Sequence, residues 1–518
     1  MTPIRPDYPT STSESAPKPR RMSPVAAAVA LVLGVAGVPL AMAQTSPEQN
    51  SPSNAPPASS SSPAIQAGPV TLTFGGFTEL ATIYRNKDET ADVGSSFNAI
   101  PMGSNQQSYI SEFRESARQS RLSLLAQGEP YDGAKAEAYF EMDFLGAAPT
   151  ANSNESNSYN LRMRNIYGKF ESDSGWYILG GQSWSLVTLE KKGMEPRDEN
   201  VPLTIDAQYV AGFNWTRNPQ VRLVDKVTDG LWLGLSLESP QATGITTTNN
   251  VPTTAGTPSA FPTDTITQVG NTSGSLYAPT TNYSIDPAPD VVAKIAADPG
   301  YGHYELYGLG RWFRSAVGTD TNTSFGGGVG AGMILPLAPQ LLSFQLSGLV
   351  GKGIARYGSG SMADVVMKPD GALEPVAEYE VLAGFTATPS SAWQLYLYSG
   401  REQESRTLYQ GILTNAAGTD FGPYYYGLGL PGANNSGCYT LGGTCAGANR
   451  KIDQVTGGFW WKAYRGQLGN VQVGMQMEWL ERTLFSGTGG LAPGAPGVAP
   501  DANIFIGMFS FRYYPYQH

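Results

Sequence analysis

The chain has 518 residues, of which 61 are glycine, 27 are tyrosine and 15% are charged. This length suits two or three ordinary domains or one large all-β barrel, and the glycine and tyrosine content favours strands and turns. Beyond the N-terminal region no apolar run reaches the ~18 residues of a membrane-spanning helix, so none is expected in the mature chain. The net charge of -10 argues against nucleic acid as a partner, because nucleic-acid binding needs a basic surface.

The N-terminal segment has the features of a secretory signal peptide. Arg20 and Arg21 precede an apolar stretch at 25–40, and the sequence AMA ending at Ala43 supplies a small-x-small cleavage site. We therefore expect residues 1–43 to be removed on export. The structural alternative is a buried hydrophobic helix.

The residues that follow the cleavage site have the composition of a linker. Residues 44–69 are rich in Ser, Pro and Ala, so we expect them to be disordered. Met22 is an alternative start, which would leave the signal without its arginines. Cleavage after residue 43 removes four basic and two acidic residues and leaves 29 against 41, a charge of -12.

The rest of the chain, 70–518, reads as one series of strands. In NVQVGMQMEW (470–479) apolar side chains at odd positions alternate with Gln, Gly and Glu at even positions, the pattern of a strand with one apolar face. Sixteen such segments occur, at 71–85, 116–127, 133–146, 160–171, 175–188, 217–226, 231–239, 288–297, 303–314, 322–335, 341–357, 376–387, 392–401, 451–465, 470–484 and 503–514.

The connections between these segments alternate between short and long. Short ones include GEPYDG (128–133) and RGQLG (465–469), whereas 189–216, 240–287 and 402–450 are long and rich in Gly, Asn, Thr and Pro. Transmembrane barrels have this form, with short turns at one end, long loops at the other and an even number of strands. A soluble sandwich gives no reason for loops to sort in this way. We therefore predict an all-β fold, an antiparallel up-and-down transmembrane barrel of sixteen strands.

The polar faces of the segments carry charge. In 133–145, for example, Lys135, Glu137, Glu141 and Asp143 alternate with small and apolar residues. Repeated charge on the inward face suits a hydrated lumen and is costly in a dry core. Aromatic residues gather at segment ends, as interfacial girdles would require, although cross-strand aromatic pairs in any sheet look similar.

Several motifs in order resemble one porin group. At ESARQSRLSLLAQG (115–128), AYFEMDFLG (138–146), NSYNLRMRNIYGKF (157–170), GGQSWS (180–185) and PDVVAKIAADPGYGHYELYGLGRWFR (289–314) the chain resembles the DcaP-like trimeric porins of Gram-negative outer membranes. This resemblance implies a sixteen-stranded homotrimeric barrel in outer-membrane lipid, without cofactor, for passive uptake of small anionic solutes such as dicarboxylates.

Two features depart from the family. Its members often carry an N-terminal helical coiled coil, which the Pro-rich residues 44–69 cannot easily form. The chain also ends in RYYPYQH and not in an aromatic residue, so the usual assembly signal would have to be read through Tyr516 or tolerated as a variant.

Basic residues on the inward faces are the candidate pore-lining and solute-selecting residues: Arg118, Arg121, Arg162, Arg164, Lys169 and Arg311. Arg121 lies on the polar side of its segment with Ser123, and Arg162 and Arg164 lie opposite apolar neighbours, so these three should face the lumen. Rings of basic residues raise the local anion concentration in a pore.

The same arginines have a structural alternative. They could pair with the acids of the neighbouring segment, Glu137, Glu141 and Asp143, and merely brace the wall. Because Arg162 and Lys169 differ in parity, both can point inward only if a bulge or a strand end occurs near Asn165.

The long connection 189–216 is the candidate constriction loop, because the third long loop of porins commonly folds into the lumen. Its charged residues are Lys191, Lys192, Glu195, Arg197, Asp198 and Glu199. A solvated external loop is the alternative.

Cys438 and Cys445, in CYTLGGTC, are expected to form a loop disulfide in an oxidising compartment. No metal site is expected, because the only histidines are His303 and His518. The same scarcity argues against an enzyme, since a hydrolase needs a His with a nucleophile and an orienting group. A surface adhesive or binding barrel that uses the long external loops is the alternative function.

Overall fold

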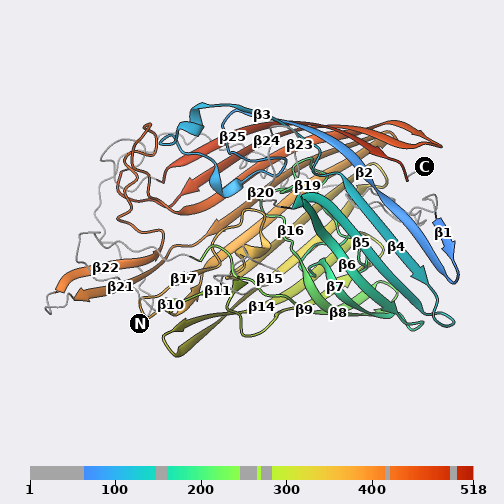
Figure 1. The fold of residues 1–518 in the computed structure, drawn as a ribbon, viewed down its shortest axis with the longest axis horizontal. Coiled ribbons are helices and arrows are strands. Elements are labelled where there is room, and N and C mark those ends of the chain that lie inside the picture. Colours follow the sequence, from blue (N-terminus) through green and yellow to red (C-terminus); the bar gives the residue numbers. More distant parts are fainter. Residues whose placement is uncertain are drawn as a thin grey trace, which may run out of the picture.

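The computed structural model describes residues 64–146, 160–245, 265–269, 283–414, 420–489 and 499–516. Within these ranges sixteen strands form one closed antiparallel barrel (Figure 1). The barrel strands are β2 (Val70–Arg85), β4 (Arg121–Gly128), β5 (Lys135–Gly146), β6 (Asn160–Glu171), β7 (Trp176–Trp184), β8 (Arg217–Thr228), β9 (Leu231–Glu238), β13 (Asp290–Ala297), β14 (His303–Val317), β15 (Asp320–Ala338), β16 (Leu342–Lys352), β19 (Ala377–Ser390), β20 (Trp393–Glu404), β23 (Asn449–Gly466), β24 (Gly469–Leu484) and β25 (Asp501–Tyr514).

Each of these strands coincides with one of the sixteen predicted segments, so the predicted fold is confirmed. The shorter elements are β1 (Ala64–Ala67), β3 (Glu112–Ser116), β10 (Thr265–Ile266), β11 (Gln268–Val269), β12 (Tyr283–Ser284), β17 (Val365–Met367), β18 (Leu373–Pro375), β21 (Thr407–Thr414), β22 (Asp420–Leu428) and the 3-10 helices η1 (Phe97–Ala99), η2 (Gln106–Tyr109) and η3 (Ala355–Tyr357). Among the described residues no helix is long and apolar enough to cross a membrane.

Strand β2 closes the barrel because it pairs on both sides. Residues 78–85 pair with the last strand, β25, and residues 71–77 pair with β4. The far end of β2 also pairs with the short strand β3, which continues the line of β4 after a break at 117–120. Every barrel strand therefore has two antiparallel neighbours, and the barrel sheet itself has no open edge.

The two ends of the barrel differ as the loop lengths predict. Short turns such as 172–175, 229–230 and 391–392 lie at one end, on the right in Figure 1, near β1. The long connections, with β10, β17, β21 and β22, lie at the other end. One pair breaks the predicted alternation: β14 and β15 are joined at the long-loop end by residues 318–319 alone.

The expected N-terminal features fall mostly outside the described residues, which begin at 64. The expected signal peptide, 1–43, and residues 44–63 of the expected linker lie there. The boundary at 69 needs correction, because residues 64–67 form strand β1 and pair with 70–73 of β2. The backbone of this part of the linker is bonded to the sheet, which its composition did not indicate.

Alternation of the side chains gives the barrel an apolar outside. Met475 and Met477 of β24 are 43% and 52% exposed, whereas Gln476 and Glu478 between and beside them are each 1% exposed. Exposed apolar side chains recur on the outward positions of the other strands: Phe140, Leu223, Leu235, Ile295, Leu306, Val350, Leu397 and Phe509. The apolar face of 470–479 thus faces away from the lumen, as a lipid-facing surface requires.

The aromatic residues at strand ends divide between the two faces. Trp176, Trp393 and Trp461 are exposed on the outside, in agreement with the expected girdle. Their sequence neighbours Tyr177 and Trp460 are buried inside the barrel and do not contribute to the girdle. Successive side chains of a strand point to opposite faces, which prevents two adjacent aromatics from sharing one girdle.

The outward position of Met477 generates a prediction for stability in lipid. Replacement of Met477 by Arg should lower the free energy of unfolding by about 2–4 kcal/mol, because a lipid-facing cation near the bilayer midplane loses its hydration. Urea titrations of the protein folded into vesicles would measure the change. Leu468→Arg is the control, since Leu468 is 72% exposed in the turn 467–468 and should tolerate the charge. Equal effects of both changes would contradict the lipid-facing assignment.

Candidate functional site

The connection 185–216 between β7 and β8 lies inside the barrel; we call it the inward segment. Its backbone N–H groups donate hydrogen bonds to lumen-facing side chains of distant strands. Glu190 donates to Glu305 of β14 at 3.0 Å, Ile205 donates to Gln476 of β24 at 2.6 Å, and Gly212 donates to Glu402 of β20 at 2.7 Å. The segment therefore crosses the lumen and is held by walls on several sides.

Local sequence explains why the segment can pack there. Its return to β8 is held by an aromatic cluster in which Tyr209 contacts Trp215, at 5.2 Å between ring centroids, and Trp184, at 6.1 Å. Gly212 has a φ of +81°, and a Cβ there would lie 2.1 Å from the carbonyl oxygen of Val381 on β19. Only glycine permits this approach of the segment to the wall.

Three of the predicted arginines form one cluster with two acids on the wall of β4, β5 and β6. Arg164 contacts Glu141 at 2.5 Å and Asp143 at 3.0 Å. Arg162 contacts Asp143 at 2.7 Å, and Arg121 contacts Glu141 at 3.7 Å. The arginines thus face the lumen and also pair with the wall, as the structural alternative proposed. Their role in solute selection stays a prediction.

A bulge in β6 brings these basic residues to one face. Arg164 has no partner in the register with β5, which shifts between the pairs Asn165–Glu141 and Met163–Met142. Met163 remains exposed on the outside, whereas Arg164, Asn165 and Lys169 are all buried inside. The irregularity lies where the sequence required one for Arg162 and Lys169 both to point inward.

The cluster contains a fourth arginine, Arg217, which is not among the candidates predicted from the sequence. The guanidinium of Arg217, the first residue of β8, lies 4.8 Å from the ring centroid of Trp184 and 5.1 Å from that of Trp215. Among the described residues it makes no ion pair, and its Nη1 is buried without a hydrogen-bond partner. Alternation along β8 would place residue 217 on the outside, so only the packing of the inward segment reveals its position.

The remaining basic candidates pair with other acids. Arg118 pairs with Asp92 at 2.6 Å, and Lys169 pairs with Glu195 of the inward segment and with Glu171. Arg311 is buried on β14, away from β4–β6, where it pairs with Asp290 at 3.1 Å and Asp364 at 2.6 Å. The six basic candidates therefore do not form one ring.

The charged residues of the inward segment are held in two ways. Arg197 bonds to Glu137 and to the hydroxyl of Tyr167, both on the wall, at 3.0 and 3.1 Å. The backbones of Lys191 and Asp198 are hydrogen-bonded to each other at 2.9 Å, which closes a loop between Glu190 and Glu199. Lys192 is exposed, and Glu195 is half exposed on its side chain.

Burial changes the titration of this loop. Glu190 is fully buried, and neither of its carboxylate oxygens has a hydrogen-bond partner. Burial, and next the nearby Glu199, raises the pKa of Glu190 well above its ordinary value, although Lys294 opposes the shift. Burial also raises the pKa of Glu199 and lowers that of Lys191.

The opposite wall is acidic. Glu378 and Glu380 of β19 and Glu402 and Glu404 of β20 all point inward and are at most 3% exposed. In the order of strands around the barrel, β19 and β20 lie across from β5 and β6, which carry the arginine cluster. The lumen thus has one basic and one acidic side, with the inward segment between them. Alternation along these strands accounts for the inward direction of the four glutamates, but it does not show that they lie together.

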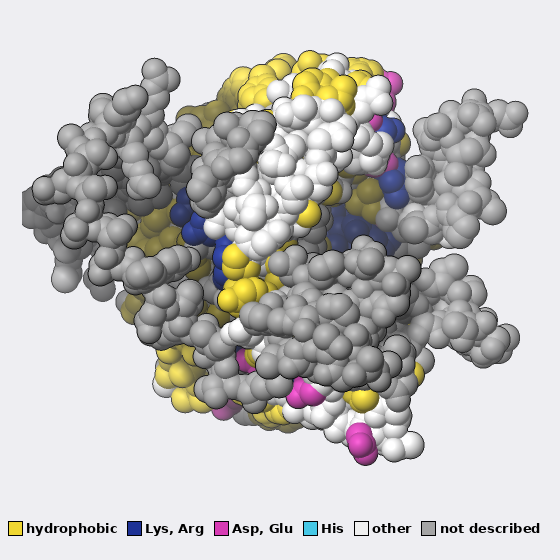
Figure 2. Space-filling view, turned by 90° about the vertical axis from the view of Figure 1, so that its left-hand side faces the viewer, with side chains coloured by type: hydrophobic (Ala, Val, Ile, Leu, Met, Phe, Trp, Pro, Cys, Tyr) yellow, Lys and Arg dark blue, Asp and Glu magenta, His cyan; other side chains and the backbone are white. Residues whose placement is uncertain are grey.

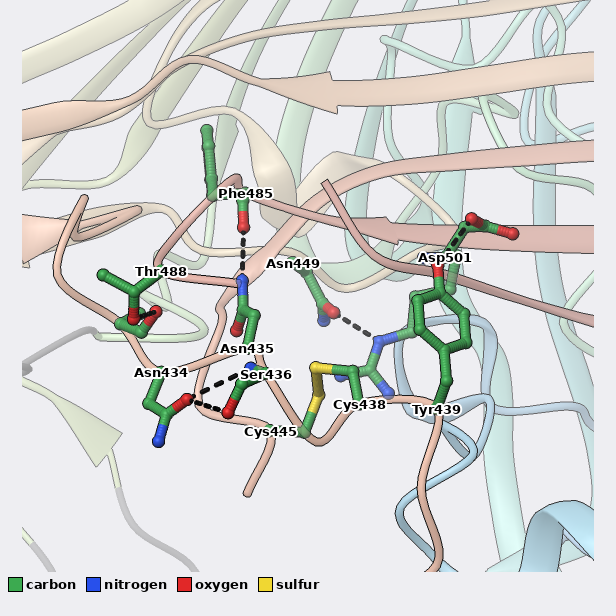
Figure 3. The surroundings of a disulfide bond; sticks show 12 residues. Asn434, Asn435, Ser436, Cys438, Tyr439, Cys445, Asn449, Phe485, Thr488 and Asp501 are labelled. Carbon is green, nitrogen blue, oxygen red and sulfur yellow. Dashed lines mark hydrogen bonds between the residues drawn. A yellow bond between two sulfur atoms is a disulfide. The ribbon is translucent and has the colours of Figure 1, made fainter. Parts of the chain in front are cut away.

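Viewed from the long-loop end, Lys and Arg side chains are visible in hollows of this face (Figure 2). At the same end a disulfide joins Cys438 and Cys445, as expected, with a Cα–Cα distance of 4.6 Å (Figure 3). The neighbouring Tyr439 donates a hydrogen bond to Asp501 at the start of β25. The disulfide-closed segment 438–445 therefore helps to fasten the long connection between β20 and β23 to the barrel rim.

Both ring nitrogens of His303, one of the two histidines that an enzyme could use, contact carboxylates. Its Nδ1 lies 2.7 Å from Asp298 and its Nε2 lies 2.9 Å from Glu305. Both ring nitrogens are thus occupied near a short turn, and neither contacts a nucleophile. His518 lies outside the described residues.

Known proteins are similar to this chain in structure and not in sequence. No protein-family model matches the chain, and no curated protein matches its sequence. The outer membrane channel DcaP of Acinetobacter baumannii has a TM-score of 0.57 at 18% identity, over 86% of this chain and 97% of that one. OmpT, an outer membrane protein of Vibrio cholerae, has a TM-score of 0.44 at 10% identity, over 87% and 99%. An anion-selective porin from Comamonas acidovorans has 0.44 at 13%, over 86% and 99%.

The similarity to DcaP confirms the resemblance inferred from the motifs at the level of the fold. The chain has the architecture of that outer membrane channel along nearly its whole described length.

The buried carboxyl of Glu190 generates a pH prediction. Its raised pKa means that the folded state holds the proton more tightly than the unfolded state, so the folded state loses stability as the pH rises above about 4.5 through the folded pKa. Glu190→Gln keeps a neutral side chain and should become progressively more stable than wild type over this rise, by about 1.4 kcal/mol per pH unit. Urea unfolding between pH 5 and 8 would measure the difference. A difference that stays constant with pH would contradict the assignment. Glu129→Gln, a change of an exposed glutamate, is the control.

Proposed function

We propose that the protein is an outer-membrane porin, a passive channel for small hydrophilic solutes with a preference for anions. The closed barrel with an apolar outside and a charged inside supports a passage through a membrane. The inward segment supports a constriction, because a loop that crosses the lumen narrows the path and brings solutes close to the wall.

The charge of the arginine cluster carries the anion preference. Three guanidinium groups, those of Arg121, Arg162 and Arg164, share two carboxylates, Glu141 and Asp143. The guanidinium of Arg217, which has no ion pair among the described residues, adds a fourth positive charge to the cluster. The cluster therefore keeps a surplus of two positive charges beside the inward segment. Such a surplus raises the local anion concentration, and two charges would suit a dianionic solute such as a dicarboxylate.

The proposal includes the location of the protein in the cell and its oligomeric state. An exported chain with this exterior would reside in the outer membrane of a Gram-negative cell, surrounded by lipid. The resemblance to DcaP-like porins supports a homotrimer, in which each barrel would conduct by itself.

Single-channel recording tests the proposal. The mature protein, folded into a planar bilayer under a KCl gradient, should give stable steps with a reversal potential that favours chloride. Arg217→Gln should reduce the chloride preference by about fivefold, because a unit charge ~4 Å from a permeating ion in water is worth about 1 kcal/mol. Arg465→Gln is the matched control, since Arg465 is exposed near a short turn.

Other results would change the conclusion in different ways. A cation preference would keep the channel and assign the arginines to bracing of the wall. An absence of conductance in well-folded protein would favour the alternative function, a surface protein that binds partners through its long loops.

A further inference from the structure

Two glutamate pairs face each other across neighbouring strands on the acidic wall. In the register of β19 with β20, Glu378 lies directly opposite Glu404 and Glu380 lies directly opposite Glu402. All four side chains point inward and are at most 3% exposed. Like charges directly opposite in a sheet repel each other, and burial strengthens the repulsion.

The hydrogen bonds around these carboxylates leave much of their capacity unused. Glu402 accepts from the backbone N–H groups of Gly212 and Gly360, and one oxygen of Glu380 accepts from the side-chain amide of Asn214. The other oxygen of Glu380 and both oxygens of Glu378 are buried and have no hydrogen-bond partner. Glu378 is thus an unpartnered side chain within the cluster.

Basic residues near the cluster are engaged elsewhere. Arg311 pairs with Asp290 and Asp364, and Arg356 lies 3.5 Å from Asp290. In the part of the chain that the structure describes, neither Glu378 nor Glu380 makes an ion pair. The charge of the two glutamate pairs is therefore not balanced by a side chain.

The geometry of three of the carboxylates suits a cation. One oxygen from each of Glu378, Glu380 and Glu402 lies within 4.8 Å of the other two. Ca²⁺ holds its oxygens at about 2.3–2.6 Å, so two ligands on opposite sides of the ion are about 5 Å apart. A set of oxygen ligands alone favours Ca²⁺ or Mg²⁺ over transition metals. Mg²⁺ retains its water more strongly, and this site is buried, so Ca²⁺ fits better.

We propose that Glu378, Glu380 and Glu402 bind one Ca²⁺ ion. The scarcity of histidine predicted no metal site, whereas this site is made by carboxylates that only the register of β19 and β20 brings together. The proposal is independent of whether solutes pass through the barrel.

The ion would join three parts of the molecule. The inward segment reaches the cluster through Gly212 and Asn214, and the connection between β16 and β19 reaches it through Gly358 and Gly360. A Cβ at Gly358 would lie 2.6 Å from Glu402 and 2.7 Å from Glu380, which shows how closely this connection approaches the carboxylates. Bound Ca²⁺ would thereby fasten the inward segment and this connection to the wall.

Calcium binding to the purified full-length mature protein, refolded in detergent without lipopolysaccharide, tests the proposal. After treatment with a chelator, equilibrium dialysis against radioactive Ca²⁺ should show one ion per chain, with a Kd near the 10⁻⁴–10⁻³ M of extracellular calcium sites. Glu378→Gln should weaken binding by about tenfold or more. Glu478→Gln is the matched control, because Glu478 is equally buried on an inward face but accepts hydrogen bonds from Gln454 and Gln476.

Thermal unfolding of the wild type gives a second measurement that needs no variant. Ca²⁺ should raise the unfolding temperature over the chelated protein, and equal Mg²⁺ should raise it less. Absence of stoichiometric Ca²⁺ binding by folded wild type would overturn the proposal and indicate that the glutamates share protons. Equal loss of binding in Glu378→Gln and Glu478→Gln would overturn the assigned site. Conductance measured on the same preparations would separate either failure from a failure of the porin proposal.

Discussion

Backbone hydrogen bonding is the constraint on which the rest of the structure depends. A bilayer offers no water to an unpaired N–H or C=O, so a sheet can cross it only as a closed barrel. Strand β2 meets this requirement by pairing with β25 over one half and with β4 over the other. Once the sheet is closed, alternate side chains must point to lipid and to the lumen, and the residues of every strand are sorted by this rule.

Closure of the barrel also places polar side chains in the lumen, and the inward segment provides hydrogen-bond donors for several of them. The inward faces carry many acids, arginines and glutamines, which need partners when the lumen is crowded. The segment 185–216 supplies backbone donors to Glu305, Gln476 and Glu402 on widely separated strands. The packing of the inward segment therefore depends on the same hydrogen bonds that satisfy the polar side chains of the barrel wall. A change in either would disturb the other.

The distribution of charge across the lumen links the two proposals. The β4–β8 side keeps a surplus of guanidinium groups, and the β19–β20 side keeps a surplus of carboxylates. A bound cation on the acidic side would reduce the negative charge that opposes anion entry. It would also hold the inward segment close to the arginine cluster, where its position sets the width of the path.

The sequence by itself determined the sixteen strands and their alternation of apolar and polar faces, because alternation and turn length are local properties of a chain. It further indicated that a bulge or a strand end near Asn165 is needed if Arg162 and Lys169 both point inward. It also placed Arg121, Arg162 and Arg164 in the lumen. Only the tertiary structure decided which charges meet. Arg217 enters the cluster because the inward segment packs against β8, and Glu378 faces Glu404 because of a register between two strands. Such contacts depend on residues far apart in the chain, and no local pattern specifies them.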